Sequence, residues 1–349
     1  GEVFEFSKGK SYTLPETFNY EGVDKSTKEF LNYINNSGFL IIHNDSIVYE
    51  DYKLGHTPET HHISWSVSKS FVSALFGILV DEGKIKSIEQ TVTDYVPELK
   101  SSGYDGVRIK DVLQMSSGVL FDENYADFNS DINRMGRAIA FGGSMDDFAA
   151  SLKREREPGK HNHYVSIDTH VLGMIIRKAT GRSMHELLEE KIWSKLGMQS
   201  DGYWIKDDKD VSFVLGGLNA TLRDYARFGR LYANHGNWNG EQIVPKEWVK
   251  SSVTPDAPHL MPGNNPNSST ALGYGYQWWL PSVPDGDFLA VGIHSQSIYV
   301  NQKRNLVIAF NSSNARFNEP GDGSKMMFIQ LFQTIAREFE EVKEEEINE

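Results

Sequence analysis

The sequence predicts an α/β protein of the α+β type, in which an antiparallel β-sheet is flanked by helices and carries an all-helical insert. Strand patterns occur only near the two ends of the chain, at 39–52 and 275–311. Each group is too small to build a sheet of its own, so we expect both to share one sheet. We therefore assign 1–83 and 271–349 to a sheet region and 84–270 to a mainly helical region, with a cleft between them.

The N-terminal elements are predicted from local patterns. Strands at 39–43 and 47–52 flank an Asn-Asp pair, which is typical of a tight hairpin turn. Apolar residues at helical spacing then predict a helix that begins near Ser66 and is closed by Gly83. By the same criteria we expect further helices at 27–35, 107–115, 168–179, 184–196, 222–234, 245–252 and from 325 onward, and further strands at 275–280, 288–301 and 305–311.

Composition excludes several classes of function. The chain has 349 residues and a formal net charge of −13, which repels phosphate backbones and anionic membrane surfaces, so we expect no nucleic-acid partner. There is no cysteine, which excludes disulfides, a thiolate nucleophile and cysteine-based zinc sites. The longest apolar stretch, 71–80, is far shorter than the roughly 20 residues of a membrane span, so no transmembrane segment is predicted.

Other catalytic motifs are missing from the sequence. It contains no G-x-S-x-G, H-E-x-x-H or phosphate-binding loop. His161 and His163 lack a third ligand at usable spacing and are interpreted as part of a polar loop, so no metal and no cofactor are expected. The chain begins at Gly1 without a signal peptide, and we expect an exported, periplasmic protein whose signal or anchor was removed, with a cytoplasmic protein as the alternative. The oligomeric state is left open.

The best candidate nucleophile is Ser66, in the sequence Ser66-Val67-Ser68-Lys69. Residues three apart share one face of a helix, so the hydroxyl and the amine can meet. A serine hydroxyl needs a base, and a lysine serves as one when burial or a nearby charge lowers its pKa. The same spacing occurs at Ser7 and Lys10 without a helical pattern, which we interpret as chance. The alternative for Ser66 is a simple helix cap.

Two later segments carry further candidates. Tyr164 lies between a loop and a predicted helix, where its phenol could relay a proton if a nearby lysine lowered its pKa, although it could equally pack at an interface. Gly292 lies within a strand pattern and would allow a substrate to approach the backbone closely. The N–H group of Ile293 could then point at a substrate carbonyl oxygen, the alternative being a bulge glycine.

These elements, in this order, resemble the serine β-lactamase and D-Ala-D-Ala-peptidase superfamily, which includes the penicillin-binding proteins. The resemblance extends from about 38 to 335 and includes VRIKDVLQMSSG at 107–118 and GGLNATLRDYARFG at 216–229. It is strongest for the esterase-like and 6-aminohexanoate-dimer-hydrolase-like branch. It implies a β-lactamase/transpeptidase-like fold and a serine hydrolase that forms an acyl-enzyme.

The resemblance also implies roles for individual residues. Ser66 would be the nucleophile, Lys69 its base and Tyr164 the proton relay, while the backbone N–H groups of Ser66 and Ile293 would form an oxyanion hole. Tyr125 would line the substrate cleft.

Two departures concern substrate binding. Ser166 stands where the family's Y-x-N motif has asparagine, and Ala290 stands where the K-T-G strand motif has lysine. The family uses that cation to bind a substrate carboxylate, so we expect less β-lactam or D-Ala-D-Ala recognition. Ser166, Gly292 and His294 remain candidates for substrate contact.

The predicted function is hydrolysis of a small ester, amide or peptide-like substrate through an acyl-enzyme. The alternatives are a D,D-peptidase or β-lactamase, and a catalytically idle binding protein on the same fold.

Overall fold

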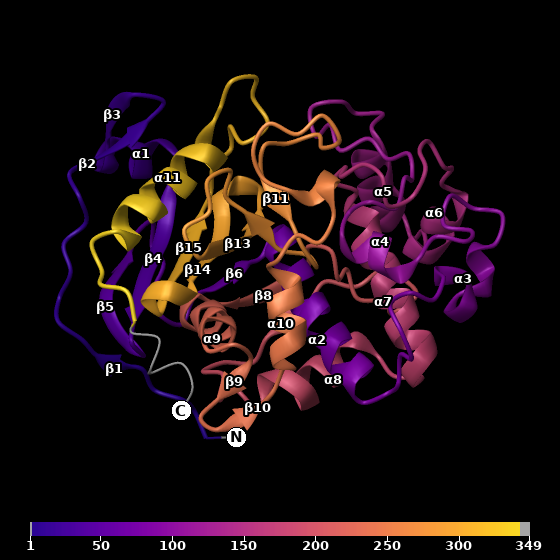
Figure 1. Ribbon diagram of the computed structural model, residues 1–349, viewed down its shortest axis with the longest axis horizontal. Coiled ribbons are helices and arrows are strands. Elements are labelled where there is room, and N and C mark those ends of the chain that lie inside the picture. The colour runs from indigo at the N-terminus through magenta and orange to yellow at the C-terminus, as the bar shows by residue number, and fades with distance from the viewer. Residues whose placement is uncertain (1, 343–349) are drawn as a thin grey trace.

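The computed structural model describes residues 2–342, and the two ends of this chain meet in one large sheet (Figure 1). In the described residues the sheet has eight strands. β4 pairs with β15, and this antiparallel pairing joins the N-terminal strands to the C-terminal ones, as the sequence predicts. The strand order is β1 (Ser7–Lys8), β5 (Ser46–Tyr52), β4 (Asn36–His43), β15 (Leu306–Ser312), β14 (Gln296–Asn301), β13 (Asp287–Gly292), β12 (Trp279–Leu280) and β11 (Gly273–Tyr274).

The predicted hairpin is confirmed. Its turn residues, Asn44 and Asp45, both have positive φ, 47° and 60°, the conformation that a tight two-residue hairpin requires and that Asn and Asp tolerate. One pairing departs from expectation, because the short β1 lies parallel to β5.

The sheet separates two hydrophobic layers. Alternate residues of β4 point to opposite faces, so Leu40 and Ile42 enter one core while Phe39 and Ile41 enter the other. The second core is covered by α1 (Thr27–Tyr33) and α11 (Ser324–Ala336), both visible at the upper left of Figure 1. The first core continues into α2 (Ser68–Asp81), α9 (Leu222–Ala233) and the remaining helices.

The predicted helices of the middle region are present with shifted bounds, namely α4 (Ile109–Leu113), α7 (Ser166–Thr180), α8 (Met184–Leu188), α9 and α10 (Lys246–Ser252). The sequence missed three short helices, α3 (Val92–Tyr95), α5 (Asp131–Ala140) and α6 (Met145–Ser151).

The middle region is not all helical, which corrects the sequence prediction. β8 (Leu218–Thr221) pairs with β6 (His61–Ile63) and β7 (Tyr203–Trp204), and β9 (Asn237–Trp238) pairs with β10 (Glu241–Gln242). These strands are too short to show alternation. In addition, α9 packs directly on β14 and β15 of the large sheet, because its apolar stripe completes the first core. The division of the chain at 84 and 270 stays a prediction.

The prediction of one strand at 288–301 is wrong. β13 ends at Gly292, the chain turns through Ile293–Ser295, and β14 returns antiparallel. His294 and Ser295 have φ of 60° and 65°, which no strand accommodates, and neither residue type signals such a turn. The predicted strand at 275–280 is also wrong in extent, because only its last two residues form a strand, β12, which pairs with β11 just before the predicted range.

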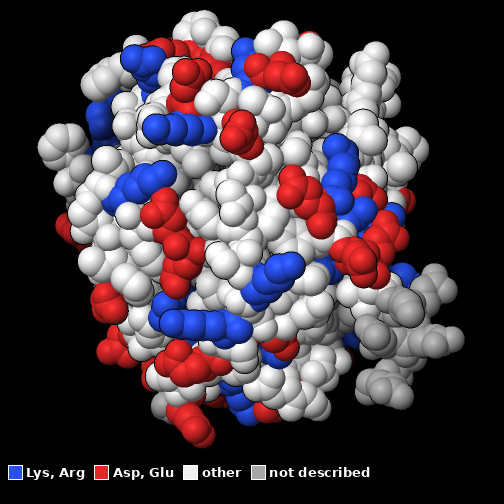
Figure 2. Space-filling model, turned by 90° about the vertical axis from the view of Figure 1, so that its left-hand side faces the viewer, with Lys and Arg blue, Asp and Glu red and all other residues white. Residues whose placement is uncertain are grey.

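Charges of both signs are mixed on the surface. On the face shown in Figure 2, lysine and arginine side chains alternate with aspartate and glutamate, without a large patch of either sign. Within residues 2–342, no helix combines the length and hydrophobicity needed to cross a membrane.

Candidate active site

Ser66 lies where a 3-10 turn, Trp65–Val67, runs into α2. Trp65, directly before it, has φ of 45°, a left-handed conformation that costs a bulky residue on the order of 1–3 kcal/mol. The packing of β13 and β14 against this turn holds the chain in that conformation. Ser66 is therefore presented at a strained junction, with α2 beginning one residue beyond Val67.

Lys69 occupies the first turn of α2 and is 2% exposed. Its Nζ donates hydrogen bonds to Ser66 Oγ at 2.9 Å and to the carbonyl oxygen of Leu215 at 2.7 Å. Burial lowers the pKa of Lys69 from 10.5 to about 7, although the nearby Glu123 carboxylate favours the charged amine. The structure thus brings the two residues of the motif into contact and makes a neutral amine available near pH 7.

Tyr164 lies two residues before α7 and lines the same cavity as Ser66. Its ring stacks on Trp279 with centroids 5.2 Å apart, and Lys69 Nζ lies 5.3 Å from its centroid. The expectation of a lowered pKa is wrong, because burial and the Glu123 charge raise the pKa of this phenol. Tyr164 therefore stays protonated at neutral pH and is suited to donate a proton.

Gly292 has a structural role that the sequence does not predict. A Cβ at this position would lie 2.5 Å from the carbonyl oxygen of Ser64 and 3.1 Å from Trp65 Cβ. The group that approaches the glycine is therefore the chain leading to the nucleophile. This contact brings Ile293 beside Ser66, and both line the cavity. Gly292 also lines the cavity, so its contact with a substrate stays a prediction. Ile293 and His294 belong to the turn after β13 and not to a strand.

The remaining candidates differ in position. His294 lines the cavity and its Nδ1 lies 2.8 Å from the Asn314 carbonyl oxygen, while Tyr125 lines it and packs on Phe317. Ser166 is fully buried as the first residue of α7 and is not part of the cavity lining, which argues against substrate contact.

Glu123 is a site residue that the sequence did not reveal. It accepts a hydrogen bond from the backbone N–H of Ser166 and lines the cavity in front of Lys69. Burial raises the pKa of this carboxyl group, and the Lys69 amine opposes that effect. An acidic residue in a loop carries no local signal, because only folding brings it near the lysine.

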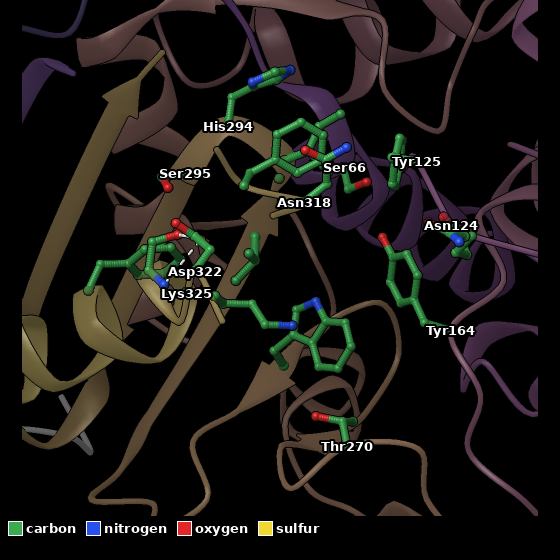
Figure 3. A pocket seen from close by; sticks show the side chains of 18 of the residues that line it. Ser66, Asn124, Tyr125, Tyr164, Thr270, His294, Ser295, Asn318, Asp322 and Lys325 are labelled. Atoms are coloured by element: carbon green, nitrogen blue, oxygen red, sulfur yellow. Dashed lines mark hydrogen bonds between the residues drawn. The ribbon is translucent and has the colours of Figure 1, made fainter. Parts of the chain in front are cut away.

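Ser66 lines two cavities. The larger cavity, about 490 Å³, is shown in Figure 3, where Tyr164 enters from one side and Lys325 of α11 from the other. A second cavity of about 380 Å³, which we call the apolar cavity, shares Ser66, Tyr125 and Ile293 with it. Its other lining residues include Ile132, Met135 and Phe213.

The family of this protein follows from its similarity to known proteins. Residues 33–326 match the family model described as Beta-lactamase, and the chain belongs to this family of serine hydrolases, which includes esterases, amide hydrolases and penicillin-binding proteins.

The chain is also similar to individual relatives and solved structures. The chain is 31% identical over 283 residues to the 6-aminohexanoate-dimer hydrolase of Paenarthrobacter ureafaciens, covering 79% of this chain and 72% of the relative. A Bacillus anthracis structure, provisionally named a 6-aminohexanoate-dimer hydrolase, has a TM-score of 0.85 at 26% identity, covering 97% of this chain and 88% of that one. A family VIII carboxylesterase, with a TM-score of 0.64 at 16% identity over 89% of this chain and 96% of its own, shares the fold.

Proposed function

We propose that this protein hydrolyses a short amide through an acyl-enzyme on Ser66, with Lys69 as the base and Tyr164 as the proton donor to the leaving group. The observation that carries the proposal is the 2.9 Å contact between Lys69 Nζ and Ser66 Oγ, made by a buried lysine whose pKa is lowered to about 7. A serine with such a partner is activated, whereas a serine that only caps a helix has no need of a buried amine.

In acylation, neutral Lys69 accepts the hydroxyl proton as Ser66 Oγ forms a bond to the substrate carbonyl carbon. The backbone N–H groups of Ser66 and Ile293 supply the oxyanion hole. Tyr164 then donates its proton to the leaving nitrogen as the C–N bond breaks, and the Lys69 ammonium reprotonates the phenolate. The raised pKa of Tyr164 supports this order of proton transfers, because it keeps the phenol protonated until the leaving group needs the proton.

In deacylation, water attacks the acyl carbon while neutral Lys69 accepts its proton. The bond to Ser66 Oγ breaks, the carboxylic acid leaves and the serine regains its proton. Every proton that leaves a nucleophile thus returns to a leaving group within the same set of residues.

An amide is preferred over an ester on the strength of the relative that is 31% identical, which is named for hydrolysis of an amide dimer. The carboxylesterase neighbour, at 16% identity, supports the fold alone. Ester hydrolysis by the same residues remains the second activity to assay, since the acyl-enzyme chemistry is shared.

The test is the intact mass of the protein after exposure to a small fluorophosphonate. We expect a single adduct on the wild type and on Ser7→Ala, and none on Ser66→Ala. Ser7 is a matched control because it starts the other S-x-x-K sequence but lies exposed in β1. Turnover of short amides and esters should follow the same pattern. Half or more of wild-type turnover in folded Ser66→Ala would refute the proposal.

A further inference from the structure

Lys325 is a cation directed into the larger cavity. It lies in the first turn of α11, and Figure 3 shows it extending toward the pocket from the side opposite Tyr164. Its Nζ lies 4.9 Å from the ring centroid of Trp279, the same ring on which Tyr164 stacks. Trp279 therefore links the amine of Lys325 to the phenol of Tyr164 across the floor of the site.

This amine has no anionic partner in the described part of the chain. Within residues 2–342, no carboxylate lies within 4.0 Å of Lys325 Nζ. The residue as a whole is exposed, yet desolvation around its amino group lowers its pKa. The nearest acidic residue in sequence, Asp322, is engaged elsewhere, because it accepts hydrogen bonds from the Ser324 backbone N–H and the Tyr33 hydroxyl.

A partly desolvated amine without a partner is unfavourable, and it is stabilised when an anion binds beside it. The N-terminus of α11 adds to the same preference, since helix N-termini carry partial positive charge. With a net charge of −13, the protein has no general attraction for anions. A substrate carboxylate would therefore need a local cation of this kind.

The position of Tyr164 indicates which half of the substrate carries the carboxylate. Tyr164 lines the larger cavity and not the apolar cavity, and the residue that protonates the leaving group must lie on the leaving group's side of Ser66. The leaving group then extends toward Trp279 and Lys325. The acyl half extends into the apolar cavity, lined by Ile132, Met135 and Phe213.

We infer that Lys325 forms a carboxylate subsite for the leaving group, so that the preferred substrates are amides whose amine half carries a carboxylate and whose acyl half is apolar. This inference rests on the proposed function and refines its substrate class. It also revises an expectation from the sequence, because a cation can be supplied from α11 although the strand position Ala290 has none.

The experiment compares paired substrates. Hexanoyl amides of linear ω-amino acids of increasing chain length are each assayed beside their carboxamide twins, which lack only the negative charge. At the best chain length, we expect wild-type kcat/KM to favour the acid by at least about tenfold, the contribution of one hydrogen bond to a charged group. Lys325→Ala should bring this ratio close to one, and Lys325→Glu should invert it.

Lys28→Ala serves as the matched control, because it removes an exposed lysine of α1, outside the cavity, and should keep the wild-type ratio. Circular dichroism confirms folding, and Lys325→Met, which keeps the apolar stem, replaces the alanine variant if that one unfolds. A wild-type ratio near one, or an unchanged ratio in the folded Lys325 variants, would overturn the inference.

Failure of the proposed function is distinguishable from failure of the subsite. If Ser66 forms no adduct and neither twin is hydrolysed, the proposed chemistry is wrong. The subsite is then tested by calorimetric titration of Ser66→Ala protein with the same pairs. Tighter binding of the acids, lost in Ser66→Ala/Lys325→Ala, would support the subsite, and equal affinities for acid and carboxamide would overturn it.

Discussion

The state of Lys69 makes the pH dependence of acylation a direct test of the proposed mechanism. Burial lowers the Lys69 pKa from 10.5 to about 7, which corresponds to roughly 5 kcal/mol in favour of the neutral amine at about 1.4 kcal/mol per pKa unit. Only the neutral amine can accept the proton of Ser66. The rate of acylation should therefore rise with pH and level off once the amine is neutral.

The expected magnitude follows from the fraction of neutral amine. Below about pH 7, kcat/KM for an uncharged substrate should fall about tenfold per pH unit, and above about pH 8 it should be nearly constant. An uncharged substrate is required because Lys325 should not contribute to its binding. The rate of fluorophosphonate labelling of Ser66 should show the same rise with pH, which we call the acidic limb of the pH profile.

Glu123→Gln should move the acidic limb of the pH profile to lower pH. The Glu123 carboxylate favours the ammonium form of Lys69, so its replacement by a neutral amide lowers the Lys69 pKa further while keeping an acceptor for the Ser166 N–H. Lys69→Ala should abolish the limb together with several orders of magnitude of activity. A rate that is flat between about pH 5 and pH 8, or a limb that shifts upward in Glu123→Gln, would refute the reasoning.

Two further predictions concern the frame of the site. Gly292→Ala should reduce kcat/KM by at least about 100-fold with little change in circular dichroism. The reason is that a Cβ 2.5 Å from the Ser64 carbonyl oxygen would displace the turn before Ser66. Near-normal activity would contradict this prediction. Asp168 is fully buried and accepts a hydrogen bond from the Tyr104 hydroxyl, and burial raises its pKa from 3.8 to about 8. Between about pH 4 and about pH 8 the unfolded state therefore binds fewer protons than the folded state, so stability falls as the pH rises. In Asp168→Asn, urea midpoints measured across this window should lose that contribution, and an unchanged pH slope would contradict the prediction.

The hairpin of β4 and β5 and the nucleophile motif could be predicted from the sequence because their signals are local. The Asn44-Asp45 turn needs residues that tolerate positive φ, and the spacing of Ser66 and Lys69 follows from the helical period. The turn at Ile293–Ser295 escaped prediction because non-local packing against the nucleophile turn, rather than residue type, imposes its backbone conformation.

The sequence by itself thus determined the one-sheet architecture, the candidate nucleophile and its lysine, since each depends on patterns within a few residues or on the order of segments. Tertiary structure alone decided the electrostatics and shape of the site. Glu123 faces Lys69, and Lys325 faces the pocket, only because a loop and the C-terminal helix both reach the cavity beside Ser66. The pKa of a lysine and the charge of a pocket depend on burial and distance, which no local stretch of sequence encodes.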